Sequence, residues 1–252
     1  VKNKTKRKTK KVALDEYVKG PEKFPLENGR LGYLPLTIQR FLKTDNKKCQ
    51  ISKMNTGIRK NTPCLVRIGV EYNEKQSFIA AISSIYIDTI KSSKVPTIAE
   101  MKEIILGALS LDLYIQLHNG NLVDIFDVGG EIDINKYTSS KTYKNLNKTN
   151  PEEINLFKKI IRSYENYRNY IMNDTIEIDY QYLWDLICMP NTSLFKQGLN
   201  LVILDIRNED ITDNVHVLCP TNHYASSFFN VNKRTTIIIK NSGLYEPIIM
   251  YE

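Results

Sequence analysis

The sequence is poor in the features that mark disulfide-rich and membrane proteins. Only four of its 252 residues are cysteines, Cys49, Cys64, Cys188 and Cys219, and no two of them form a Cys-x-x-Cys pair. Four scattered cysteines do not make a disulfide framework, so we interpret them as reduced thiols in an intracellular protein. No apolar run approaches the roughly 18 residues of a transmembrane helix. The basic N-terminus also lacks the apolar run of a secretory signal.

Motifs for nucleotides and metals are missing as well. The sequence contains neither a G-x-x-x-x-G-K-[ST] phosphate loop nor a G-x-G-x-x-G fingerprint. It has three histidines. Of the candidate zinc ligands, His216, Cys219 and His223 lie close in sequence, but no fourth ligand is nearby and their spacing matches no common site. We therefore expect neither a metal nor a cofactor.

Acidic residues are absent from the first eleven positions. This tail holds seven basic residues: Lys2, Lys4, Lys6, Arg7, Lys8, Lys10 and Lys11. The rest of the chain has 28 Lys or Arg and 28 Asp or Glu, so the net charge of +7 lies in the tail. A neutral body argues against a nucleic-acid groove across the domain, whereas the tail can contact phosphates or act as a nuclear-targeting tract. The simpler alternative is a solvated linker.

The composition is that of a globular protein. Hydrophobic residues make up 42% of the chain, with 15 Tyr and 8 Phe against 11 Gly and 9 Pro. Residues 1–30 are polar, and Pro21 and Pro25 disfavour helix there. We predict a basic tail and extended lead-in over residues 1–30 and a single globular domain over residues 31–252.

Helical patterns come first along the chain and β-rich runs cluster last. Residues 97–100 form a Thr-Ile-Ala-Glu capping box, and Pro151 opens the longest helical pattern. Residues 124–150 are rich in Gly, Ser, Thr and Asn and are interpreted as a mobile connection. We predict helices over residues 36–43, 77–87, 97–117 (continuous or with a break), 151–172 and 179–188, and strands over residues 64–70, 199–206, 215–218, 235–239 and 248–251. The fold class is α/β of the α+β type, with a small, largely antiparallel sheet packed between helices.

Two segments have the pattern of a protease active site. Residues 74–82 read EKQSFIAAI, a polar turn that runs into an apolar helix, and residues 236–248 read TIIIKNSGLYEPI, a strand, a turn and a second strand. They resemble the nucleophile turn and the histidine hairpin of ovarian-tumour (OTU) cysteine proteases, a papain-like family. Trp184 with its helix and the run at 199–204 resemble other parts of that family. The resemblance spans residues 62–252 and implies an OTU/papain-like fold.

The reactive groups of that family are missing from these segments. Ser77 stands where the family has its cysteine, Leu244 stands where it has its histidine, and Glu246 follows in the hairpin. A serine hydroxyl needs a base, and leucine cannot accept a proton. Without the family comparison, Ser77 is the N-cap of a helix over residues 78–87, and Ser242-Gly243 is a tight turn between strands.

Three functions follow from these observations. The first is a non-catalytic OTU-like domain that binds another protein, ubiquitin-like or a viral or host factor, and carries a basic N-terminal arm. The second is an active deubiquitinase or protease that uses Ser77 or a relocated histidine such as His223. The third is a nucleic-acid-binding module that acts through residues 1–11. Cys64 lacks a helix start and is interpreted as a buried structural thiol.

The source of the chain is suggested by a further resemblance. The heavy use of Lys, Asn and Ile, together with Gly-Tyr-Leu-Pro at residues 32–35, resembles proteins of large cytoplasmic DNA viruses. This resemblance implies a component of a virion or of a transcription apparatus.

Overall fold

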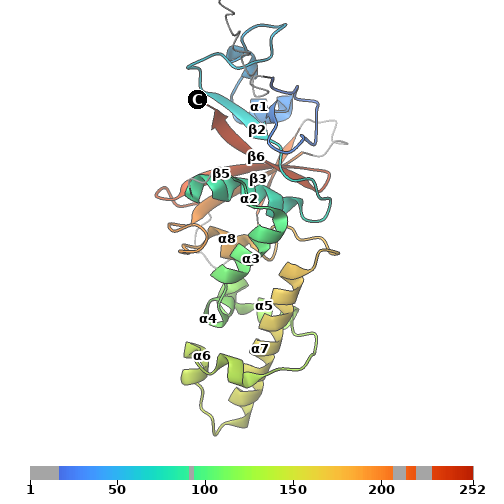
Figure 1. The fold of residues 1–252 in the computed structure, drawn as a ribbon. Helices are drawn as coiled ribbons and strands as arrows, with labels where there is room; N and C mark the ends of the chain where they lie inside the picture. Colours follow the sequence, from blue (N-terminus) through green and yellow to red (C-terminus); the bar gives the residue numbers. More distant parts are fainter. Residues whose placement is uncertain (1–16, 91–93, 207–213, 220–228, 252) are drawn as a thin grey trace, which may run out of the picture.

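The structure, a computed structural model, has a β-sheet in its middle and an elongated arm of helices on one side of it (Figure 1). It describes residues 17–90, 94–206, 214–219 and 229–251. The predicted basic tail at residues 1–11, with its seven basic residues, lies outside these ranges. In the described ranges, no helix combines the length and the apolar character needed to cross a membrane.

Six strands form one sheet in the order β1-β2-β6-β5-β3-β4. Their bounds are β1 Leu31–Tyr33, β2 Cys64–Ile68, β3 Leu199–Ile206, β4 Val215–Leu218, β5 Arg234–Asn241 and β6 Leu244–Tyr251. All neighbours are antiparallel except β3 and β5, which run parallel. The prediction of a mixed α/β fold with a largely antiparallel sheet is confirmed, and β3 and β4 have the predicted bounds.

Both faces of this sheet are covered by helices. Because side chains alternate along a strand, Ile238 belongs to the main core and its neighbour Ile239 to a smaller cluster on the other face. The main core includes α2 (Ser77–Ile90) and α8 (Trp184–Cys188), whereas the smaller cluster includes Ile38 of α1 (Leu36–Phe41). The apolar segment after Ser77 is therefore a buried helix against the sheet, as predicted.

The arm consists of α3 to α7. Their bounds are α3 Ile98–Ala108, α4 Leu111–Tyr114, α5 Leu122–Ile125, α6 Lys141–Lys144 and α7 Pro151–Met172. The capping box at Thr97 and the bounds of the longest helix are as predicted. The predicted helix over residues 97–117 is broken, because Leu109 is extended and Ser110 caps a new helix by accepting a hydrogen bond from the Leu113 amide.

Two other expectations about connecting segments are wrong. The segment 124–150, expected to be a mobile connection, contains α6 and a 3-10 helix at Ile134–Tyr137. The globular fold also begins before residue 31. Val18 and Leu26 are buried, and the backbone at Lys19 pairs with β1 at Gly32. The sequence signal was weak because only two apolar anchors hold this extended segment.

The cysteines are not all reduced thiols. Cys49 and Cys64 form a disulfide with their Cα atoms 5.9 Å apart, while Cys188 and Cys219 are free. The prediction of reduced thiols is wrong for this pair. Residues 50–63 form a loop that brings Cys64 back beside Cys49, and the sequence spacing of the two cysteines does not reveal this approach. Cys64 is buried as predicted, but its sulfur is paired rather than free.

Candidate functional site

The start of α2 and the β5–β6 turn meet in the structure. Asn241 of β5 pairs with Leu244 of β6, which leaves Ser242 and Gly243 as a two-residue turn. Both turn residues have positive φ, 51° and 81°, as a type I′ hairpin requires. The turn predicted at Ser242-Gly243 is confirmed.

Ser77 contacts this hairpin directly. Its Oγ accepts a hydrogen bond of 2.8 Å from the amide of Tyr245, and the ring of Phe78 packs edge-on against the Tyr245 ring. Since one peptide bond separates that amide from Leu244, covalent geometry places the Leu244 Cα within about 5 Å of Ser77 Oγ. Ser77 and Leu244 are therefore neighbours, as predicted.

Ser77 is not the N-cap of α2. The helix begins at Ser77 itself, and the hydroxyl bonds to β6 rather than to the helix. Asn73 supplies the local cap, because its side-chain oxygen accepts from the amides of Lys75 and Gln76. The sequence signal Ser-Phe-Ile is the same for both roles, so only the tertiary contact distinguishes them.

The segment 173–178 closes the site from one side. The Gln76 side chain donates to the carbonyls of Asn173 and Ile176 at 3.3 and 2.8 Å. The Lys75 side chain donates to the Thr175 carbonyl, and the Lys75 carbonyl accepts from the Ile178 amide. Ser77 is 4% exposed. A substrate carbonyl cannot reach its hydroxyl unless neighbouring groups move.

A buried lysine reinforces this closure. Lys102 of α3 has a fully buried side chain that bonds to Asp174 at 2.7 Å and to the Asn173 carbonyl at 3.3 Å. Sequence reasoning missed this residue, although Lys102 falls on the same face of the helix as the buried Ile98 and Ile105. A charged residue on an apolar face was the available signal.

No base is in hydrogen-bonding contact with Ser77 among the described residues. His118 lies in the arm beside Tyr182, and His216 lies in β4, which β3 and β5 separate from β6. Three strand spacings amount to about 14 Å. His223 lies outside the described ranges. Burial raises the pKa of the Tyr245 phenol, so it stays protonated and cannot accept the serine proton.

Glu246 faces away from Ser77 and forms a buried ion pair. Its carboxylate lies 2.7 Å from the Arg67 guanidinium and accepts a bond of 2.6 Å from the Leu26 amide. Burial raises the pKa of Glu246, while Arg67 and the Leu26 amide oppose that shift. Because alternate residues of a strand share a face, Glu246 and Tyr245 point to opposite sides. Glu246 therefore cannot orient a base next to Ser77.

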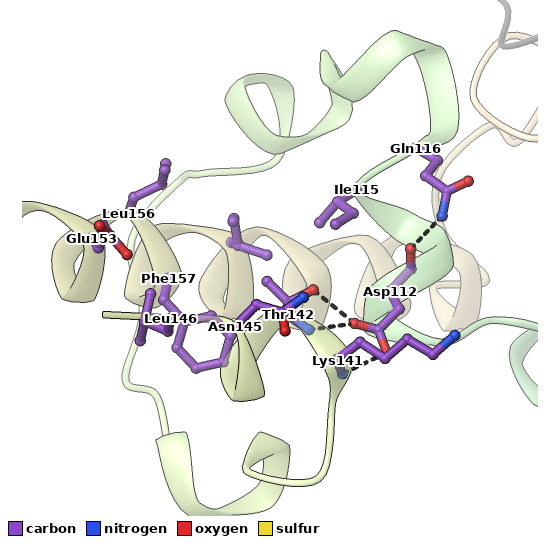
Figure 2. Close-up of a pocket in the computed structure, with 11 residues that line it drawn as sticks. Asp112, Ile115, Gln116, Lys141, Thr142, Asn145, Leu146, Glu153, Leu156 and Phe157 are labelled. Carbon is purple, nitrogen blue, oxygen red and sulfur yellow. Dashed lines mark hydrogen bonds between the residues drawn. The ribbon is translucent and has the colours of Figure 1, made fainter. Parts of the chain in front are cut away.

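The arm holds a separate cavity of about 440 Å³ between α4, α6 and α7. Figure 2 shows apolar side chains along it, with Glu153 at one end and Lys141 near Asp112 at the other. Leu156 lies at its margin and is 55% exposed. A cavity with this lining can accept an apolar side chain. It offers no metal site, since no group of three His, Cys, Asp or Glu residues that could hold an ion occurs in the described part of the chain.

Asp112 fixes one wall of this cavity. Its carboxylate accepts bonds from the amides of Lys141 and Thr142 and from the Thr142 hydroxyl (Figure 2). Burial disfavours the charged form, but the hydrogen bonds from Thr142 and Lys141 outweigh it and lower the pKa of Asp112.

We expect Asp112→Ala to lower the free energy of unfolding by about 1 kcal/mol, the usual effect of losing a helix cap. The loss should be complete at neutral pH. It should shrink as the pH falls through the lowered pKa of Asp112, because the protonated carboxyl no longer stabilises the wild-type fold. Urea unfolding between neutral pH and about pH 3 measures both effects. Asp124→Ala, which removes an exposed carboxylate, is the control, and an equal loss in both variants would contradict the assignment.

No family model, no curated protein and no solved structure matches this chain.

Proposed function

We propose that the chain is a non-catalytic OTU-like domain that works by binding another protein, either ubiquitin-like or a viral or host factor. The observation that carries the proposal is the contact between Ser77 and the hairpin at Tyr245. It unites the two segments that resemble the OTU active site. The same contact also occupies the hydroxyl oxygen that would have to attack a substrate.

Three features support binding rather than hydrolysis. Leucine stands at position 244, Ser77 is nearly inaccessible, and Glu246 is committed to Arg67 on the opposite face. Acyl transfer needs a nucleophile, a base and an orienting group within reach of one another. An active enzyme would have to recruit its base from outside the described residues.

The proposal includes an intracellular location, in the cytoplasm, the nucleus or a virion, and a role in a virion or in transcription. These follow from the resemblance to proteins of large DNA viruses. The disulfide between Cys49 and Cys64 is more typical of oxidising compartments.

We assign the partner to the arm cavity. The proposed occupant is an apolar side chain of the partner protein, with a basic group of the partner near Glu153. The apolar walls and the carboxylate of Glu153 at one end (Figure 2) support this choice. A partly exposed leucine such as Leu156 at the margin is a suitable anchor for such a contact.

The test uses mono-ubiquitin and ubiquitin chains as probes. We expect binding without cleavage, measured by calorimetry and by gel analysis after long incubation. Leu156→Asp should weaken binding at least tenfold, whereas Leu36→Asp, at an equally exposed leucine of α1, should not. Cleavage by the unmodified chain that Ser77→Ala abolishes would establish the active alternative instead. Absence of any binding would exclude a ubiquitin-like partner.

A further inference from the structure

The neutral charge of the body conceals a separation of charge along the chain. Residues 17–68 hold 11 Lys or Arg and 3 Asp or Glu, whereas residues 69–252 hold 17 basic and 23 acidic residues. Figure 1 places the segment from α1 to β2 at the end of the molecule opposite to α6. The expectation that a neutral body lacks a basic face therefore averaged a basic N-terminal segment with a more acidic remainder of the chain.

The basic end is densest between residues 40 and 60. Seven exposed cations occur there: Arg40, Lys43, Lys47, Lys48, Lys53, Arg59 and Lys60. The single acidic residue of this stretch, Asp45, uses its carboxylate to cap a 3-10 helix by accepting from the Lys47 amide. The five lysines and Arg59 form no salt bridge with any residue that the structure describes. Exposed cations without a carboxylate partner are available to bind an external anion.

A cavity of about 400 Å³ opens within this basic end. Its lining residues include Arg59, Lys60, Asn55, Asn61 and Tyr251, together with Val18, Leu31, Ile51, Gly57 and Ile58. Tyr251 is 39% exposed at the end of β6, where it pairs with Cys64 of β2. The volume lies within the range of pockets that hold small ligands, about 300–1,000 Å³.

The loop that carries these groups is held in one conformation. Its two sides are joined by the bonds from the Ile51 amide to the Gly57 carbonyl and from the Arg59 amide to the Cys49 carbonyl. The Tyr33 hydroxyl donates to the Thr56 carbonyl at 2.6 Å, and the Cys49–Cys64 disulfide closes the base. A fixed loop loses little conformational entropy when a ligand binds.

We propose that this cavity is a binding site for single-stranded nucleic acid. One base stacks on Tyr251 and meets the amides of Asn55 and Asn61, while Arg59 and Lys60 hold the flanking phosphates. The remaining cations of residues 40–53 continue the phosphate track. Single-stranded chains are recognised in this way, by aromatic stacking within a positively charged groove. The site is independent of Ser77 and of the arm cavity. The nucleic-acid proposal can therefore be tested separately from the proposed protein partner.

The lining favours a nucleic acid over other polyanions. An acidic protein or an anionic membrane would use the cations but would leave the ring of Tyr251 and the two amides without a role. Double-stranded nucleic acid keeps its bases stacked and would have to unpair and flip one out, at a cost in free energy, to place it in a cavity. The single aromatic ring among cations is therefore the observation that selects the ligand.

The experiment measures the affinity of the full chain for a fluorescent oligothymidylate of about 20 nucleotides. We expect Arg59→Glu with Lys60→Glu to weaken binding at least tenfold. The salt slope should fall by about 1.4, because each phosphate that a cation neutralises on a single strand contributes about 0.7. Lys136→Glu with Lys144→Glu, the same charge change at exposed lysines of the arm, should leave the affinity nearly unchanged. This control separates the site from a general effect of net charge.

A second variant tests the base contact. Tyr251→Ala should weaken binding about tenfold, but it should not alter binding of an abasic oligomer of the same length. Equal affinities in the two charge-reversal pairs would overturn the proposal, because binding would then lie in the tail at residues 1–11. Displacement by polyglutamate or by anionic vesicles as effective as by oligothymidylate would also overturn it. The site would then be one for polyanions in general.

Discussion

Replacing Arg67 with alanine is expected to lower the free energy of unfolding by about 3–5 kcal/mol, the cost of leaving one partner of a buried ion pair alone. The side chains of Arg67 and Glu246 are 0% and 2% exposed. The guanidinium also donates to four backbone carbonyls, those of Tyr33, Gly20, Pro21 and Lys23. The variant therefore loses the group that fastens the N-terminal segment to the sheet.

The stability defect should depend on pH. Burial already raises the pKa of Glu246 in the wild-type protein, and removal of Arg67 raises it further. A carboxyl whose pKa is higher in the folded state binds an extra proton there, so stability falls as the pH rises from the unfolded value of about 4.3 through the raised folded value. The variant should be closest to wild type near pH 5 and furthest from it near pH 8.

Two comparisons isolate the cause. Lys159→Ala breaks a more exposed ion pair with Asp124 and should lower the free energy of unfolding far less than Arg67→Ala does. Arg67→Lys keeps the charge but cannot reach several carbonyls at once, so its loss should be intermediate. Hydrogen exchange in residues 17–30 should rise in Arg67→Ala alone. Unchanged protection there would show that the segment is held by Val18 and Leu26 instead.

The main elements were predictable where one physical signal dominated. The longest helix has a Pro at its start and a regular apolar row through Phe157, Ile161 and Tyr164, and its bounds match the prediction. The runs at β3 and β4 are β-rich and bounded by polar residues, so they matched as well. Local propensity, periodicity and burial agreed in these segments.

Prediction from the sequence failed for features that depend on contacts between residues far apart in the chain. Arg67 stands in the apolar run of β2, and the reason for a charge there is Glu246, which is 179 residues away. The Cys49–Cys64 pair and the closure of the site by residues 173–178 depend on how loops return to the sheet. Neither the periodicity nor the composition of the sequence indicates where a loop packs back against the sheet. The contact of Ser77 with the hairpin was foreseen only because a family resemblance supplied the pairing.

The contact between Ser77 and the β5–β6 hairpin leads to a chemical prediction, which is that a reactive cysteine can be introduced at position 77. Ser77→Cys places a thiol at the start of α2, and Leu244→His places an imidazole on the hairpin residue whose Cα lies within about 5 Å of position 77. A helix start and a neighbouring imidazolium both lower a thiol pKa. Both cysteine variants share the helix start, so the imidazolium accounts for the difference between them. A fall from about 8.5 to about 7 raises the thiolate fraction at pH 7 about 16-fold, and the lower nucleophilicity of the less basic thiolate offsets about fivefold of this gain. The double variant should therefore be labelled by a small haloacetamide about three times faster than Ser77→Cys alone.

The rate is measured by mass spectrometry of the peptide that contains position 77, because Cys188 and Cys219 also carry thiols. A small reagent is needed since Ser77 is nearly buried. Ser83 is the matched control, for it is 1% exposed in the same helix and donates to the Pro96 carbonyl. Leu244→His should not accelerate Ser83→Cys. If it fails to accelerate Ser77→Cys as well, the hairpin does not present position 244 to the nucleophile position, and the likeness to the OTU site ends at the backbone.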